Sequence, residues 1–367
     1  MAIFSDKHVL LYDLITGQKV ADLDSAAQHC RGLCFTPDGS ELAGLFFDNR
    51  HTKVLSWTMA DRKQVVSHSL VGDYKHVLKG AFSYKGPAID VLPDGSAFLL
   101  YGHGIVDRAS GRLVWMIEDS PADFNPVPRR LLDNDHVTVA AGSSQGERRL
   151  AVLRLPWAKI DASLKALAAG AEAHVKPGQS VSLHVEVAAV RAGSPDETKA
   201  DLVKALTERL EGDGFKVADG QPVTLSVRYN EEAGATLNEM ASQGGRGPGG
   251  SPAAGPFGNT VATGKTIQGT KAFCEASLQL AGSKEPLWST RIESDPHHLI
   301  VHQDASDAAA RSATYGMMKT NLTQQLMPYF VPKDDSLASL PGTTVLKGKA
   351  ESAPQNRATP KPTRRGK

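Results

Sequence analysis

The chain has 367 residues, a length that corresponds to two or three domains. Its 41 basic and 40 acidic side chains give a formal net charge of +1, so no overall charge attracts it to nucleic acid or to an anionic membrane. The cysteines are Cys30, Cys34 and Cys274, too few for a scaffold held together by disulfides.

The first 156 residues carry a repeated pattern of strands and turns. Pro-Asp-Gly-Ser occurs at 37–40 and again at 93–96, each time between two apolar runs. Pro sets φ for a turn and Gly supplies a positive φ, so both copies predict a hairpin corner. A second turn recurs further along, where Asp13, Thr16 and Gly17 match Asp107, Ser110 and Gly111. The order of strands, corner and Ser-Gly turn describes a four-stranded blade.

These motifs resemble those of the WD-repeat and quinoprotein-like β-propeller families over about residues 8–156. The resemblance implies a partial propeller of about three and a half four-stranded blades, in which 8–23 supplies half a blade, whereas propellers typically close with four to eight. Three explanations remain open: a truncated product without its upstream blades, half of an assembly that closes with a second copy, or an open curved sheet. We favour truncation, and we expect self-association through the open propeller edge.

The start of the chain lacks the long apolar region of a signal peptide, and no run approaches 18 apolar residues. We therefore expect a cytoplasmic protein with no membrane span, unless an upstream signal sequence has been lost.

Residues 157–179 are rich in alanine and predict a helical linker. Ser180–Val190 then alternates between apolar and polar residues, as a half-buried strand does. Ser194-Pro195-Asp196-Glu197 is a capping box that starts a helix. Its apolar face comprises Leu202, Val203, Leu206 and Leu210.

Three more strands and a closing helix complete the C-terminal half. We place the strands at about 223–229, 272–280 and 286–294, and the helix at Ser306–Phe330. The resulting order, β-α-β-β-β-α, predicts a two-layer sandwich over 180–330, so the fold class is multidomain, β followed by α+β. In topology alone it is similar to small α/β domains of bacterial envelope lipoproteins.

Two segments predict disorder. Residues 241–270 are rich in Gly and Pro and are expected to form a mobile insert in the α+β domain. Residues 331–367 are expected to form a disordered basic tail, whose last 21 residues hold seven basic side chains and one acidic side chain. Without interleaved aromatic residues, such a tail is a poor nucleic-acid-binding signal, so a nucleic-acid partner is not expected.

A histidine cluster is the candidate metal site. His297, His298 and His302 lie near Asp295 and Asp304, and imidazoles and carboxylates bind metals at such spacing. The simpler interpretation is a loop before a helix in which Asp304 or Ser306 is the N-cap.

Two other motifs predict no chemistry. Gly264-Lys265-Thr266 lacks the glycine that a phosphate-binding loop needs five residues earlier, where Asn259 stands, and Lys265 is expected to lie in the mobile insert. Cys30 and Cys34 lack a second pair of ligands for zinc, so they are expected to be buried thiols.

No catalytic or cofactor-binding residues stand out, and no cofactor is expected. The favoured function is therefore a non-enzymatic scaffold whose propeller loops contact a protein partner. The alternative is a fragment of a propeller enzyme, with a cofactor bound in a ring that is completed elsewhere.

Overall fold

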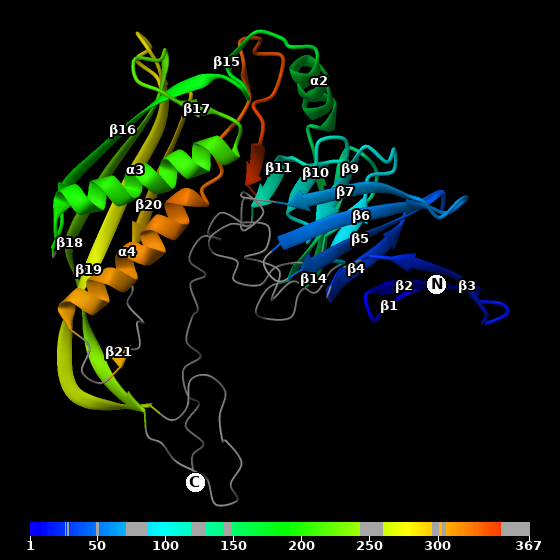
Figure 1. Ribbon diagram of the computed structural model, residues 1–367, viewed down its shortest axis with the longest axis horizontal. Coiled ribbons are helices and arrows are strands. Elements are labelled where there is room, and N and C mark those ends of the chain that lie inside the picture. The colour runs from blue at the N-terminus through cyan, green and yellow to red at the C-terminus, as the bar shows by residue number, and fades with distance from the viewer. Residues whose placement is uncertain are drawn as a thin grey trace, which may run out of the picture.

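The computed structural model consists mostly of strands in several sheets, with three helices in the part of the chain that it describes. None of these helices is long and apolar enough to cross a membrane. Figure 1 shows a group of N-terminal sheets beside a larger C-terminal sheet that two helices cover. No sheet closes on itself within the described residues. These are 1–25, 27, 29–48, 51–70, 87–118, 129–142, 148–191, 193–242, 260–295, 301–302 and 306–345.

Four sheets follow one another along the N-terminal half, and within each of them the N-terminal strands pair antiparallel. The first holds β1 (Ala2–Ser5), β2 (His8–Tyr12) and β3 (Lys19–Asp24); the second holds β4 (His29–Phe35), β5 (Glu41–Asp48), β6 (His51–Thr58) and β7 (Gln64–Leu70). The third holds β8 (Ile89–Val91), β9 (Ala97–Leu100), β10 (Gly104–Asp107) and β11 (Leu113–Glu118); the fourth holds β12 (Arg129–Leu131), β13 (His136–Gly142) and β14 (Arg148–Arg154). The half blade predicted from residue 8 is therefore a three-stranded sheet, because β1 pairs with β2.

The recurring turns have the predicted geometry. Gly39 and Gly95 close the two Pro-Asp-Gly corners with φ of 71° and 72°. Gly17 and Gly111 end the two Ser/Thr-Gly turns with φ of 69° and 66°. In every case the Asp carboxylate of the turn accepts a backbone N–H two or three residues further on. The same residues thus form the same turn at both places in the chain.

The C-terminal half follows the predicted order with two short strands added. After α2 (Trp157–Ala168) and β15 (Ala173–Val175), five strands form one sheet in the order β17-β16-β18-β19-β20, and β21 pairs with β18. Helices α3 and α4 both lie on one face of this sheet (Figure 1). The bounds are β16 (Ser180–Ala189), α3 (Pro195–Gly212), β17 (Lys216–Val217), β18 (Val223–Ser242), β19 (Thr260–Leu280), β20 (Trp288–Ser294), β21 (Val301–His302) and α4 (Asp307–Thr323).

The predicted caps start both helices. The Ser194 hydroxyl accepts the Glu197 backbone N–H at 3.4 Å, and Pro195 is the first helical residue of α3. The Ser306 hydroxyl accepts the Ala309 N–H at the start of α4. Helix α4 ends at Thr323, seven residues before the predicted end.

Two expectations of disorder are corrected. Residues 241–242 belong to β18 and residues 260–270 to β19, and the two strands pair in a long hairpin. Residues 243–259 of the expected insert lie outside the described residues. Residues 331–345 contain β22 (Val331–Pro332), which pairs with β15, and β23 (Gly342–Val345), which pairs with β11. Only 346–367 of the expected tail lies outside the described residues. In both cases backbone pairing overrides a composition that is poor in apolar residues.

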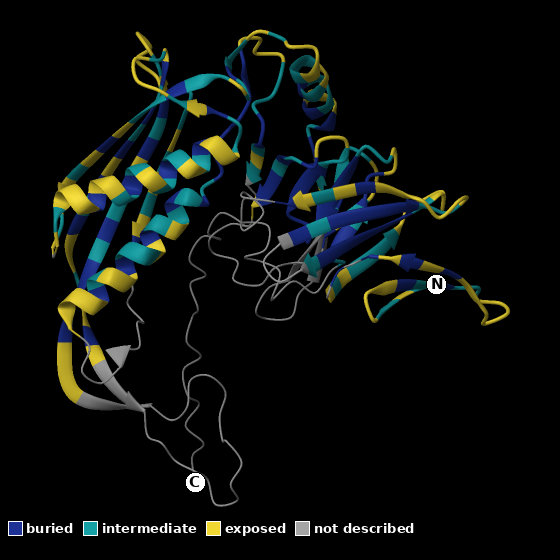
Figure 2. Cartoon of the chain, viewed as in Figure 1, coloured by how far each residue is buried: buried dark blue, intermediate teal, exposed yellow. Residues whose placement is uncertain are grey.

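One hydrophobic cluster joins the two halves. It runs from strands of the third and fourth sheets, through Trp157 and Ile160 of α2, to the interior of the C-terminal sheet. Figure 2 shows buried positions lining the strands on both sides of this junction. The hydrophobic core of the α+β unit is therefore continuous with that of the third and fourth N-terminal sheets.

Strand β23 closes this junction from the C-terminal end. It pairs in parallel with β11, so residues of the last described segment complete a sheet of the N-terminal half. The Trp115 indole N–H donates to the Thr344 hydroxyl at 2.9 Å. The Trp115 ring lies directly over Gly342, where an added Cβ would be 2.0 Å from the ring. Glycine is required there because the ring occupies the space of a side chain.

A buried ion pair holds α4 against the C-terminal sheet. Glu231 of β18 has no exposed side-chain surface and pairs with Arg311 of α4 at 2.7 Å. Its carboxylate also accepts the Tyr229 hydroxyl at 2.7 Å and the Arg191 backbone N–H at 2.8 Å. Arg311 in turn donates to the Thr198 hydroxyl of α3 at 3.1 Å. Burial, together with the adjacent Glu231 carboxylate, raises the pKa of Tyr229 above its ordinary value. Arg311 thus links both helices to the buried Glu231 carboxylate of the sheet.

We expect Gly342→Ala to lower the free energy of unfolding by about 1–3 kcal/mol, because the new methyl group overpacks against Trp115. Gly316→Ala in α4 is the matched control: its Cβ would meet no atom within 4 Å beyond its own helix. That substitution should stabilise the protein by up to about 1 kcal/mol through helix propensity. Urea unfolding of both variants measures the difference, and an unaffected Gly342→Ala variant would contradict the close packing on Trp115.

We expect Arg311→Ala to lower the free energy of unfolding by about 3–5 kcal/mol, since it leaves the Glu231 carboxylate buried without its partner charge. Arg291→Ala is the control, because Arg291 pairs with Glu275 at 3.5 Å while 64% of its side chain is exposed. Exposed pairs contribute about 0–1 kcal/mol. Equal losses in the two variants, measured by chemical denaturation, would contradict the role given to the buried pair.

Candidate functional site

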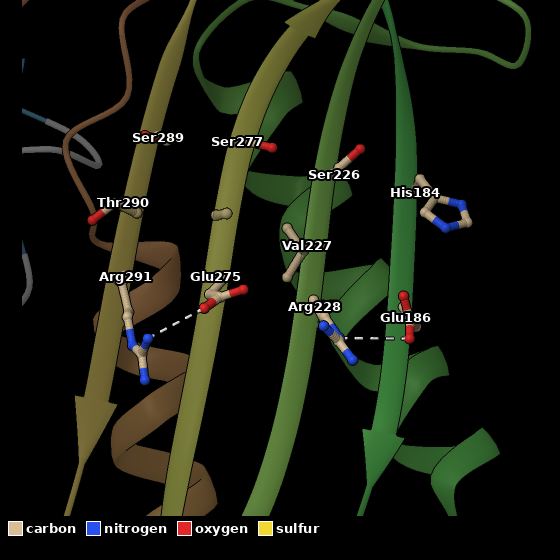
Figure 3. A pocket seen from close by; sticks show the side chains of 11 residues that line it. His184, Glu186, Ser226, Val227, Arg228, Glu275, Ser277, Ser289, Thr290 and Arg291 are labelled. Carbon is tan, nitrogen blue, oxygen red and sulfur yellow. Dashed lines mark ion pairs between the residues drawn. The ribbon is translucent and has the colours of Figure 1, made fainter. Parts of the chain in front are cut away.

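The face of the C-terminal sheet opposite the helices is polar. Strands β16, β18, β19 and β20 each alternate, with mainly apolar side chains toward α3 and α4 and mainly polar ones toward the other face. Figure 3 shows the polar side chains standing on the four neighbouring strands, away from the helices. We call this surface the polar face; it comprises His184, Glu186, Ser226, Arg228, Glu275, Ser277, Ser289 and Arg291.

A row of alternating charges crosses the polar face. Glu186 lies opposite Arg228, Arg228 opposite Glu275, and Glu275 opposite Arg291, so one transverse row runs through all four strands. The Arg228 Nε is 3.6 Å from Glu186 Oε1, and the Arg291 Nη1 is 3.5 Å from Glu275 Oε1 (Figure 3). Register alone aligns these charges, because each strand contributes one of them.

A row of one histidine and three serines lies next to the charged row. It comprises His184, Ser226, Ser277 and Ser289, each two residues along its strand from a member of the charged row. Because serine is short, the surface is lower here, and the two rows line an open hollow of about 490 Å³. Hydroxyl groups both donate and accept hydrogen bonds, so this floor accommodates either kind of polar group.

An aromatic side chain borders the charged row on its other side. The Phe273 ring lies 4.8 Å from Lys271 Nζ and 5.5 Å from Arg291 Cζ. Lys271 pairs with Glu293 of β20 at 2.6 Å, and this hydrogen bond raises the pKa of the Lys271 ammonium group. The cations therefore stand at defined positions around a ring that offers apolar contact.

The ion pairs of the charged row can open to bind another molecule. More than half of each side chain is exposed in the Arg228–Glu186 and Arg291–Glu275 pairs. Exposed pairs of this kind contribute about 0–1 kcal/mol, so a bound molecule can replace them at little cost. The polar face can thus present two carboxylates, two guanidinium groups and a row of hydroxyl groups to one ligand.

The metal site predicted at His297, His298 and His302 stays a prediction. His297, His298 and Asp304 lie outside the described residues, and His302 is the last residue of β21. Ser306 begins the following helix as its N-cap. Among the described residues, no three His, Cys, Asp or Glu side chains gather as metal ligands would.

The structure also describes the Gly-Lys-Thr motif and the N-terminal cysteines. Lys265 is exposed within β19, so its expected position in a mobile loop is wrong, and its strand conformation differs from that of a phosphate-binding loop. Cys30 and Cys34 are half-buried free thiols on β4. Burial, with a contribution from Asp90, raises the pKa of Cys34 to about 11, and burial raises that of Cys274 to about 12. High pKa values of this kind keep the thiols protonated and unreactive at neutral pH.

No motif in the sequence marks the polar face as a site. The alternation in β16 and β18 marks their polar residues as outward-facing, which by itself predicts only contact with water. The missing signal is the register between strands that lie up to a hundred residues apart, since register alone places Glu186, Arg228, Glu275 and Arg291 in one row.

No protein-family model matches this chain, and no curated protein matches it. Among solved structures, the chain is similar to a neuraminyllactose-binding hemagglutinin homolog from Helicobacter pylori. The identity is 17%, the match covers 42% of this chain and 89% of that one, and the TM-score is 0.27.

Proposed function

We propose that this chain is a non-enzymatic interaction scaffold whose polar face binds a segment of a partner protein. The observation that carries the proposal is the row of four alternating charges next to a row of hydroxyl groups, on a sheet face that α3 and α4 leave uncovered. A surface four strands wide suits an extended segment rather than a small substrate that needs enclosure.

The charge pattern favours a protein over a nucleic acid. Glu186 and Glu275 are each 55% exposed on the polar face. A phosphate backbone, which is uniformly negative, would lie against both carboxylates, and like charges in contact oppose binding. A polypeptide with acidic and basic side chains can pair with both signs. The partner we propose is therefore a protein segment of mixed charge.

We further infer that the four N-terminal sheets are blades of a WD-repeat-like or quinoprotein-like propeller. In support, each sheet joins strands that are consecutive in the sequence, apart from the addition of β23 to the third, and the corner turns at Gly39 and Gly95 share one conformation. In this arrangement the loops between the strands of the blades are the ones expected to contact a protein partner. The polar face adds a second contact surface on the same scaffold.

The test uses a photo-crosslinking amino acid, p-benzoylphenylalanine, in the full chain expressed in its own organism. At position 277, in the floor of the hollow, we expect a discrete adduct with a protein. At position 204, which is exposed on α3 on the opposite side, we expect none. The protein identified in this way is then purified and titrated with the purified chain.

A charge exchange tests the specificity of that contact. Glu275→Arg combined with Arg291→Glu keeps an ion pair between these two positions and inverts the polarity of half the row, but it puts an arginine opposite Arg228. We expect the affinity for the identified protein to fall at least about tenfold, while the free energy of unfolding falls by less than about 1 kcal/mol because the new like-charge pair is exposed. Equal adducts at positions 277 and 204, an adduct with nucleic acid, or undiminished affinity of the exchanged variant would overturn the proposed function.

A further inference from the structure

One edge of the C-terminal sheet is open over the middle of β16. On its inner side β16 pairs with β18 along almost its full length. On its outer side β17 pairs only with Ser180 and Val181, so within the described part of the chain residues 183–187 have no neighbouring strand there. Exposed edges are usually blocked by lysine, proline or a covering loop, because they otherwise pair with another strand. Residues 183–187, Leu-His-Val-Glu-Val, contain neither lysine nor proline.

The same edge leaves core side chains partly uncovered. Five apolar side chains pack against the main hydrophobic cluster but are only partly buried, and they lie on β16, the turn after it, α3 and β17. They are Leu183, Val187, Val190, Val203 and Val217. Partly covered apolar side chains beside an unpaired strand favour association, since a second strand would satisfy the backbone and cover the apolar atoms together.

The sequence of the open stretch is complementary to itself. In an antiparallel pair of two β16 strands centred on Val185, Leu183 of each copy lies opposite Val187 of the other. On the polar face of the sheet, His184 of each copy then lies opposite Glu186 of the other. Registers centred on His184 or Glu186 would instead put a polar side chain, His184 or Glu186, opposite its own copy, whereas the centre at Val185 puts only an apolar side chain opposite itself. The centre at Val185 is the register in which both faces match.

The ends of the open stretch agree with this register. Strand β17 occupies the edge beside Ser180 and Val181, which limits pairing at the start. The pairing of β16 with β18 shifts between Val187 and Ala189, and such an irregularity bends the strand at the other end. Five residue pairs, 183–187 of each copy, therefore fit between the two limits.

We propose that two copies of this chain form a dimer by antiparallel pairing of their β16 strands, centred on Val185. The two-fold axis is perpendicular to the sheet, so both polar faces lie on the same side of one continuous sheet. A partner with two binding segments would then contact both faces at once, and linked contacts of this kind raise the overall affinity.

Light scattering of the full chain measures the assembly, with an expected mass of twice 39.1 kDa at high concentration. Glu186→Lys places a lysine opposite His184 and should weaken dimerisation at least about tenfold. Adding His184→Glu restores opposite charges across the axis and should restore the dimer. Glu293→Lys on β20, at the other edge of the sheet, is the matched control and should leave the dimer intact. A monomeric wild type, or a dimer that Glu186→Lys does not weaken, would overturn the proposal.

Cysteine substitution tests the register itself. His184 of one copy lies opposite Glu186 of the other on the exposed face, so their Cα atoms would be about 4.5–5.5 Å apart, a distance that a disulfide can span. An equal mixture of His184→Cys and Glu186→Cys chains should therefore give a covalent dimer on mild oxidation. Either variant alone should give none beyond the wild-type level, because its cysteine then faces a glutamate or a histidine. Equal cross-linking of the mixture and of the single variants would overturn the register centred on Val185. Neither readout involves the partner protein, so the dimer and the proposed function can fail separately.

Discussion

The return of β23 to the edge of β11 is the constraint on which the arrangement of the two halves depends. A strand of four residues pairs in parallel with a sheet whose other strands come from more than two hundred residues earlier in the chain. Short parallel pairings are weak by themselves. Here the pairing is supported by the hydrogen bond from Trp115 to Thr344 and by the ring lying over Gly342. Because one hydrophobic cluster runs through the junction, separating the halves would expose apolar side chains on both sides.

The C-terminal sheet uses charged residues in two different ways. On its helix side, Glu231 and Arg311 are buried and joined to Tyr229, Arg191 and Thr198, so the pair holds α3 and α4 in register with β18. On its polar face, the charges of Glu186, Arg228, Glu275 and Arg291 are exposed and loosely paired. Buried charges cannot exchange partners without a large loss of stability, whereas exposed ones can. A rigid support beneath an exchangeable surface is suited to binding.

The proposed dimer and the proposed scaffold concern different parts of the same sheet. The polar face offers its charges and hydroxyl groups perpendicular to the plane of the sheet, while the edge of β16 offers backbone groups within that plane. Pairing at the edge leaves the hollow between His184 and Ser289 uncovered, because an added strand extends the sheet instead of stacking on it. Two copies would therefore present two hollows to a partner without either contact blocking the other.

The sequence by itself determined the local structure of this protein. Pro-Asp-Gly at 37–39 and 93–95 specified the corners, Ser194 and Ser306 specified where α3 and α4 begin, and the alternation in 180–190 specified a half-buried strand, because each of these signals acts within a few residues. Only the tertiary structure decided the rest. Residues 260–270 and 342–345 form strands although their composition predicted a loop and a tail, since pairing with β18 and β11 satisfies their backbone groups. The charged row and the open edge of β16 depend on the register between distant strands, and no local pattern encodes register.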